Sequence, residues 1–195
     1  MTLLGEKESD NHTMTAISSK QIIADYVNYK LESKGYTWPN SPPLPPPKRI
    51  NRTMRLIADE FDERYTDIFE DMCGQMNITP DTVYTTFIGI VHNVYSDGIT
   101  WGRVVAVFAF GGALAVHCVE KEMPDIVDSI VDWVATYVDS DLEPWITENG
   151  GWSYFVEFFE KSSERAWESP WPWRAACGIA AGIGVVALGA ILSNR

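Results

Sequence analysis

The strongest constraint on the fold is the apolar segment at residues 100–119, TWGRVVAVFAFGGALAVHCV. From residue 104 to residue 116 it carries no polar side chain. A surface helix is apolar along one stripe only, whereas this segment is apolar on every side. The uninterrupted apolar run, residues 104–116, is shorter than the ~20 residues of an ordinary membrane span and longer than the ~10 residues that strands rarely exceed. It therefore predicts a buried central helix, with Thr100 as the N-cap.

The composition predicts one domain with tails. The chain has 195 residues, of which 46% are hydrophobic, and its net charge is −12. Nucleic acid is not an expected partner, because its phosphates would be repelled by this charge. Three widely spaced cysteines form no metal or redox motif, which suits a reducing compartment, and Cys118 is predicted to be an inert core thiol.

Up to residue 72, the sequence predicts two amphipathic helices. Residues 1–18 are polar and aperiodic, which predicts disorder. A helix is expected from Lys20 to just before Gly35, and a second from Ile50 to Met72 with a solvated acidic face that includes Asp59. Between them, residues 39–49 are rich in proline, which favours a stiff linker or, alternatively, a polyproline ligand for an aromatic groove.

Three more helices are predicted downstream. Thr79-Pro80-Asp81 and Met123-Pro124-Asp125 carry helix-start signals, and Asn149-Gly150-Gly151 breaks the chain before another amphipathic stretch. No alternation typical of strands was found. The predicted fold class is therefore all-α, a helical bundle at residues 19–165.

The C-terminal residues 174–195 predict a transmembrane tail helix. Residues 175–192 carry no charge, and tryptophans concentrate just upstream in a juxtamembrane linker at 166–173. Indoles favour the membrane interface, so a tail anchor is preferred here over a buried C-terminal helix.

No enzyme, metal or cofactor site is expected. The three histidines lie far apart and no phosphate-binding or nucleophile motif is present, so His117 is interpreted as a core residue. Arg103 is the residue that looks out of place. It lies in the first turn of the central helix, where the helix dipole disfavours a cation by ~0.3–1 kcal/mol. Its partner is either an internal carboxylate or an approaching ligand.

Four stretches resemble the motifs of the Bcl family (B-cell lymphoma two family) of apoptosis regulators, and most closely its Bcl-xL-like survival members. DGITWGRVVAVFAFGGALAV (97–116) resembles the first motif and EPWITENGGWSYFVEFF (143–159) the second. MRLIADEF (54–61) resembles the third and DYVNYKLESKGYTW (25–38) the fourth. They occur in the family's order and are followed by the hydrophobic tail.

The resemblance implies a helical bundle around a central hydrophobic helical hairpin, residues 100–119 with 125–140. It also implies a surface groove that captures the amphipathic death-motif helix of pro-apoptotic relatives, with Arg103 pairing with an aspartate of that helix. The implied groove residues are Phe61, Tyr65, Phe69, Met72, Ile90, Val94, Thr100, Gly102, Arg103, Phe110 and Phe159. Two of them depart from the family pattern, because Thr100 replaces an asparagine and Phe159 replaces a tyrosine.

The resemblance further implies an anti-apoptotic regulator that prevents permeabilisation of the mitochondrial outer membrane. The alternative within the same fold is a pro-apoptotic pore-forming executioner. Expected partners are pro-apoptotic relatives and, in addition, beclin-like autophagy proteins. The expected location is the mitochondrial outer membrane, tail-anchored and facing the cytosol, with the endoplasmic reticulum and the cytosol as further sites.

Overall fold

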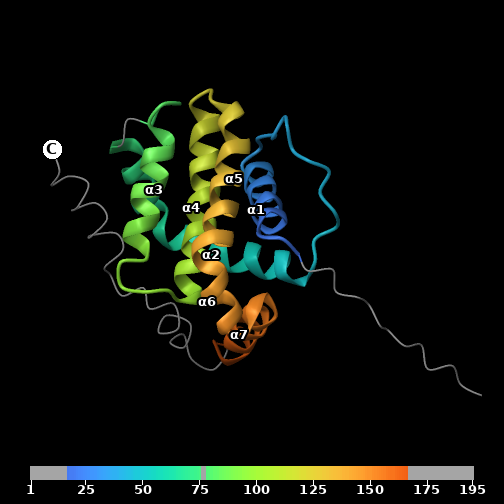
Figure 1. Cartoon of the computed structure of the whole chain (residues 1–195). Helices are drawn as coiled ribbons and strands as arrows, with labels where there is room; N and C mark the ends of the chain where they lie inside the picture. Colours follow the sequence, from blue (N-terminus) through green and yellow to red (C-terminus); the bar gives the residue numbers. More distant parts are fainter. Residues whose placement is uncertain (1–16, 76–77, 167–195) are drawn as a thin grey trace, which may run out of the picture.

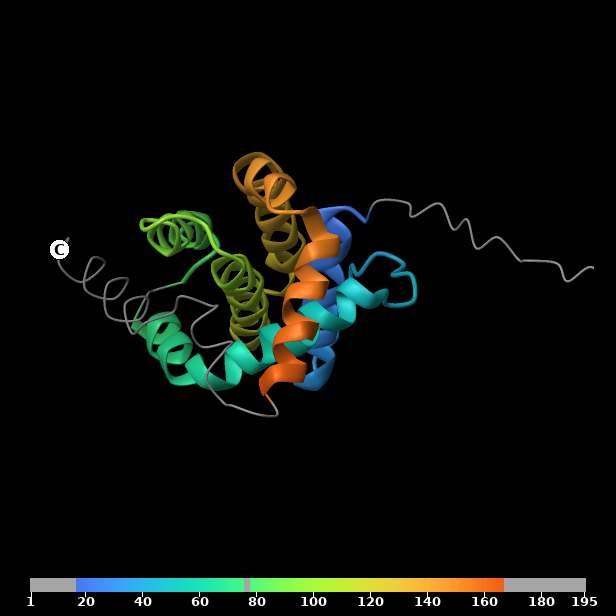
Figure 2. The same cartoon turned by 90° about the horizontal axis from the view of Figure 1, so that it is seen from below.

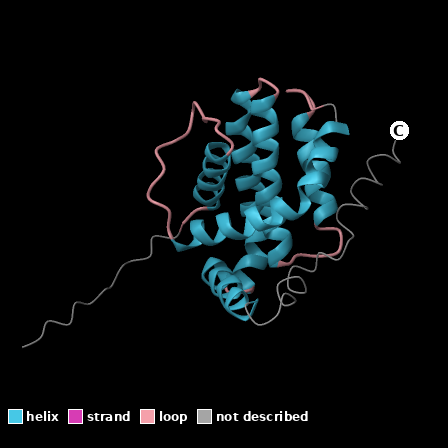
Figure 3. Cartoon of the chain, turned by 180° about the vertical axis from the view of Figure 1, so that it is seen from behind, coloured by secondary structure: helices cyan, strands magenta, loops and turns pink. Residues whose placement is uncertain are grey.

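The computed structural model describes residues 17–75 and 78–166, with the backbone alone at 68–75 and 162–166, and every regular element in these ranges is helical (Figures 1 and 3). The α-helices are α1 (Ser19–Ser33), α2 (Arg49–Gln75), α3 (Val83–Val94), α4 (Trp101–Glu120), α5 (Val127–Tyr137), α6 (Glu143–Glu148) and α7 (Gly151–Ala166). A 3₁₀ turn, Pro124–Ile126, precedes α5, and a π turn, Val138–Leu142, follows it. The predicted all-helical bundle is confirmed.

Helix α4 forms the core, as predicted. It packs against α1, α2, α3 and α5, which surround it in the view from below (Figure 2). The Thr100 hydroxyl accepts a hydrogen bond from the backbone N–H of Arg103 at 3.3 Å and so caps the helix. Within the described ranges, α4 alone is long and apolar enough to cross a bilayer by length and composition, and 78% of its most apolar window is buried.

Two glycines let the neighbouring helices approach α4 closely. A Cβ at Gly111 would lie 2.9 Å from the Val134 side chain of α5, and one at Gly112 would lie 2.7 Å from the Tyr26 ring of α1. These separations are shorter than van der Waals contact. The Gly111-Gly112 pair therefore sets the distance at which α1 and α5 pack on the core helix.

Helix α1 begins and ends as the sequence predicts. Ser18 and Gln21 form a capping box at its start, and Gly35, with φ of +80°, lies in the left-handed region just past its end. Beyond it, the Trp38 indole N–H donates to the Asp128 carboxylate at 2.7 Å. The start of the linker is thereby tied to α5.

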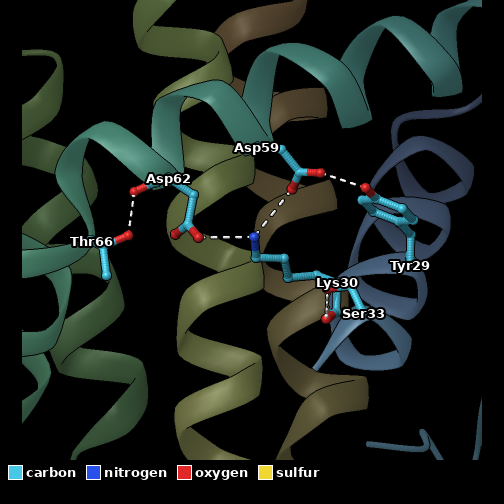
Figure 4. A network of polar contacts seen from close by, with 6 residues as sticks. All are labelled: Tyr29, Lys30, Ser33, Asp59, Asp62 and Thr66. Atoms are coloured by element: carbon cyan, nitrogen blue, oxygen red, sulfur yellow. Dashed lines mark hydrogen bonds and ion pairs between the residues drawn. The ribbon is translucent and has the colours of Figure 1, made fainter. Parts of the chain in front are cut away.

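Helix α2 buries the apolar residues of its inner face, Ile50, Met54, Ile57 and Phe61, as its periodicity predicts. Its acidic face, however, is not simply solvated. Lys30 of α1 places its ammonium 3.1 Å from Asp59 Oδ1 and 2.8 Å from Asp62 Oδ2, and the Tyr29 hydroxyl donates to Asp59 at 2.5 Å (Figure 4). We call these four residues the α1–α2 clasp. The prediction of a solvated face was wrong here because periodicity does not reveal a buried lysine on another helix.

The clasp holds a buried charge. The Lys30 side chain is 8% exposed, and Asp62 is 15% exposed. Burial by itself lowers the pKa of Lys30, but the neighbouring carboxylates of Asp62 and Asp59 outweigh it, so the pKa lies above its usual value. A charge taken out of water in this way is tolerated only because it is paired.

Several predicted helix boundaries differ from the structure. The second helix of the predicted hairpin, 125–140, is an α-helix only from Val127 to Tyr137, between the 3₁₀ and π turns. Arg49 belongs to α2, so the linker ends at Lys48, and α3 begins at Val83 rather than at Pro80. The earlier signal forms a separate turn, in which the N–H of Thr82 donates to the carbonyl of Thr79 at 3.1 Å. The apolar residues that the sequence predicts to face the core are buried, except for Ile126 of the 3₁₀ turn, which is half-buried. They are Val83, Phe87, Ile90, Val91 and Val94 in α3, and Val127, Ile130, Val131, Val134 and Val138 in and just after α5.

Several predictions lie outside the described residues. They are residues 1–16 of the predicted disordered segment 1–18, residues 167–173 of the predicted juxtamembrane linker 166–173, and the tail helix at 174–195. The prediction of disorder is wrong for residues 17 and 18, because Ile17 packs against the core and Ser18 caps α1. Ala166, predicted as the first residue of that linker, is the last residue of α7.

Candidate functional site

Arg103 lies where α3 meets α4, and its guanidinium folds back onto the turn between them. Its Nη1 donates to the carbonyl of Gly98 at 2.6 Å, and its Nη2 lies 3.5 Å from Asp97 Oδ2. Gly98 has φ of +100°, a backbone conformation that side chains rarely adopt, and this turn brings Asp97 round to the guanidinium. The structure therefore gives Arg103 an internal carboxylate, one of the two alternatives that the sequence left open.

That internal pair is weak. Asp97 is 82% exposed while the Arg103 side chain is 12% exposed, and the contact is long for a charged hydrogen bond. Exposed ion pairs contribute ~0–1 kcal/mol to stability. Moreover, Arg103 Nε is buried and makes no hydrogen bond within the part of the chain that the structure describes. The guanidinium can therefore exchange Asp97 for a better carboxylate at small cost.

Tyr95 holds the backbone beneath this arginine, and the sequence analysis did not single it out. Its hydroxyl donates to the Arg103 carbonyl at 3.1 Å, and its ring stacks on Tyr137 at 5.7 Å. Burial raises the pKa of Tyr95 well above its ordinary value, so it remains a donor at any physiological pH. No sequence pattern marks Tyr95, because its contacts with Arg103 of α4 and Tyr137 of α5 depend on how separate helices pack.

The apolar residues predicted for the groove lie on four helices. Phe61 and Tyr65 of α2 have ring centroids 4.6 Å apart, and Phe110 of α4 stacks on Phe87 of α3 at 6.1 Å. Phe159 of α7 contacts Phe155 at 5.0 Å. The exposed fractions are 5% for Phe61, 3% for Ile90, 5% for Val94, 1% for Phe110 and 2% for Phe159.

The helices that carry these residues pack against one another. Helix α4, which carries Thr100 at its cap and Gly102, Arg103 and Phe110 within it, contacts both α2 and α3, and α2 also contacts α7. Phe159 and Ile57 line a shared pocket at the α2–α7 junction. The backbones of Phe69 and Met72 belong to α2, but their side chains lie outside the described residues. The structure therefore does not test whether the side chains of Phe69 and Met72 line a groove.

The third motif is mainly core. Met54 and Ala58 are fully buried and Phe61 nearly so, whereas Leu56 is 62% exposed beside the α2–α7 pocket. Most apolar side chains of residues 54–61 are therefore part of the core. Among the described residues, no group of three or more His, Cys, Asp or Glu is placed to hold a metal ion.

Comparison with known proteins identifies the class. Residues 54–152 match the family described as apoptosis regulator proteins, Bcl-2 family. These residues include most of the core, the Arg103 turn and the start of α7. The chain belongs to the Bcl-2 family, and it is therefore a regulator of apoptosis and not an enzyme.

Individual relatives match over most of the chain. Bcl-2-like protein 1 from Homo sapiens is 34% identical, covering 73% of this chain and 82% of the relative. Bcl-2-like protein 1 from Gallus gallus is 32% identical over 91% of this chain and 99% of the relative. Apoptosis regulator Bcl-2 from Gallus gallus is 30% identical over 78% of this chain and 85% of the relative.

Proposed function

We propose that this chain is a survival regulator that captures the amphipathic death-motif helix of pro-apoptotic relatives and so prevents permeabilisation of the mitochondrial outer membrane. The observation that carries the proposal is the environment of Arg103. It is a mostly buried cation whose internal carboxylate is exposed and distant, on a helix that packs against the other predicted groove helices. The family assignment and the resemblance to survival members support it.

The proposed groove is lined by Phe61, Tyr65, Phe69, Met72, Ile90, Val94, Thr100, Gly102, Arg103, Phe110 and Phe159. An amphipathic helix binds such a groove through apolar anchors on one face. Because the described phenylalanines are 5% exposed or less, a partner helix must uncover them as it binds. Gly102, next to Arg103, has no side chain and is itself buried.

Location and further partners are proposed on the sequence and the family resemblance alone. Residues 174–195 would anchor the chain to the mitochondrial outer membrane, and fractionating cells that express a chain lacking 175–195 tests this. Helices of beclin-like autophagy proteins are candidate ligands of the same groove. The alternative function, a pore-forming executioner, shares the fold. Release of a trapped dye from liposomes distinguishes the two functions, because only an executioner causes release by itself.

Calorimetric titration of a death-motif peptide tests the groove. Truncating one partner of a buried interfacial charge pair costs ~2–5 kcal/mol, and this partly open site should lie near the lower end. Arg103→Ala should therefore bind about thirtyfold more weakly, taking ~1.4 kcal/mol per tenfold. The same variant loses the Gly98 hydrogen bond, so its stability should fall by only about 1 kcal/mol.

Unchanged affinity in Arg103→Ala would show that Arg103 is not the charge partner. A peptide in which the aspartate is replaced by asparagine is the matched control on the ligand side. It should bind the native chain weakly and should lose little more on binding to Arg103→Ala, because both changes remove the same pair.

A further inference from the structure

The linker between α1 and α2 carries an exposed run of prolines that the proposed function does not use. Its sequence from residue 42 to residue 47 is PPLPPP, followed by Lys48 and Arg49. All five prolines are exposed, whereas Leu44 is half-buried and packs against the core. In Figures 1 and 3 the linker runs as an open arc away from the helices.

Covalent geometry restricts this run to the polyproline II conformation. Each proline fixes φ near −65°, and a residue that precedes proline is pushed to extended backbone, which applies here to every residue of the run except Pro43 and Pro47. Every peptide bond in the described ranges is trans. Six residues in this conformation span about 19 Å, at ~3.1 Å per residue.

The threefold repeat of this helix leaves two rows of proline facing solvent. With three residues per turn, residues i and i+3 share a row. Pro42 shares one with Pro45, and Pro43 shares the next with Pro46. Leu44 begins the remaining row and holds it against the core. The exposed rows thus present the Pro-x-x-Pro spacing twice.

Both ends of the run are fastened to the bundle. At the start, Trp38 and Asn40 donate to the two carboxylate oxygens of Asp128, at 2.7 and 3.0 Å. At the end, the Arg52 guanidinium donates to the Pro47 carbonyl at 2.6 Å. A ligand already held in its bound conformation loses less entropy on binding, so this anchoring favours recognition of the run as it stands.

The charge at the end of the run specifies the partner further. Lys48 is exposed and lies two residues after Pro46, giving a cation at one end of the proline rows in a chain whose net charge is −12. Arg49 and Arg52 are engaged by Glu160 and by Pro47. A partner groove that binds this segment would therefore be complementary to it in charge if carboxylates lay next to the aromatic residues of the groove.

We propose that residues 42–48 are a docking segment for a protein domain with an aromatic-lined polyproline groove and an acidic rim, of the SH3 type. Prolines lack an N–H and their rings are preformed apolar ridges, which is what such grooves recognise. The segment lies on the face formed by the linker, α1 and the start of α2, so docking there leaves Arg103 accessible.

Fluorescence titration of the full chain against two probes tests this proposal. The probes are an SH3 domain that selects Pro-x-x-Pro followed by a basic residue, and a WW domain that selects Pro-Pro-Leu-Pro. The SH3 probe should bind saturably, and Pro43→Ala or Pro46→Ala should each weaken it at least tenfold. Pro39→Ala, an exposed proline outside the run, is the matched control and should change the affinity less than twofold.

Thermal melts should be the same for all three variants, because the prolines are exposed. Lys48→Glu should weaken the SH3 probe by about fivefold or more. Absence of SH3 binding, or binding that all three proline variants reduce equally, would overturn the proposal. Tighter binding of the WW probe than of the SH3 probe would overturn the acidic-rim assignment.

Discussion

The Arg103 guanidinium lies 3.5 Å from the Asp97 carboxylate, across a turn in which the arginine is 12% exposed and the aspartate is 82% exposed. This asymmetry means that the two charges are solvated very differently. Water already stabilises Asp97, whereas the mostly buried Arg103 guanidinium makes only one other hydrogen bond within the described residues, to the Gly98 carbonyl. An aspartate supplied by a partner helix would therefore compete with Asp97 for Arg103 at low cost.

Asp97→Asn should strengthen binding of a death-motif peptide about two- to fivefold, which corresponds to the ~0–1 kcal/mol of an exposed ion pair. The gain should shrink in 1 M salt, because exposed charges are screened over a few ångströms there. Calorimetric titration at low and high salt measures both effects. Asp139→Asn removes another exposed acid elsewhere, and an equal gain in that control would attribute the effect to net charge alone.

Lys30→Met should destabilise the bundle by about 3 kcal/mol, since removing one member of a buried ion pair leaves the other charge unpaired. For a chain of this size that corresponds to a fall in Tm of roughly 6–12 °C. Differential scanning calorimetry measures it. Most of the loss should be recovered when Asp59→Asn and Asp62→Asn are added, because the unpaired carboxylates are then gone.

Lys20 supplies the matched control. It also joins α1 to another helix, through Asp132 of α5 at 2.5 Å, but the two side chains are 60% and 56% exposed. Lys20→Met should therefore cost under ~1 kcal/mol. Equal losses in Lys20→Met and Lys30→Met would contradict the account of the clasp as a buried pair.

Two tyrosines on α1 should respond to the same substitution with opposite signs. The Tyr26 hydroxyl is buried and has no hydrogen-bond partner among the described residues, whereas the Tyr29 hydroxyl donates to Asp59. An unsatisfied buried polar group costs ~1–3 kcal/mol. Tyr26→Phe should thus stabilise the protein and Tyr29→Phe should destabilise it, each by about 1 kcal/mol in urea unfolding.

The alkaline side of the stability profile should depend on Tyr26. Burial, followed by the nearby Asp59 and Asp62, raises the pKa of Tyr26 well above 10.0. Above pH 10.0 the Tyr26 hydroxyl loses its proton in the unfolded chain but keeps it in the folded chain. The free energy of unfolding therefore falls as pH rises. Urea unfolding at pH 8 and pH 11 should show a smaller loss for Tyr26→Phe than for the native protein. An equal loss in the two would contradict this assignment.

The sequence predicted the fold well where one helix decides its own environment. The uninterrupted apolar run of α4 has to be buried whatever surrounds it, and Thr100 caps it through a contact three residues away. Prolines at 42–47 exclude a helix there through covalent geometry alone. These features need no knowledge of a partner helix.

The contacts that escaped prediction join distant residues. Lys30 and Asp62 lie on separate helices, and the pattern of neither helix alone shows that they meet. The approach of Asp97 to Arg103 depends on the positive φ of Gly98. The family resemblance supplied the predicted groove residues, because neither periodicity nor composition distinguishes Phe110, which is predicted to line the groove, from Phe108, which is not.

The central claim is most directly tested by release of a trapped dye from liposomes of mitochondrial outer-membrane composition. A pore-forming relative is added, activated by a death-motif peptide, in the presence of the full chain or of its Arg103→Ala variant. We predict that the native chain causes no release by itself and suppresses release by the relative, and that Arg103→Ala suppresses it much less. Release caused by the native chain alone would contradict the survival assignment and would identify the chain as an executioner.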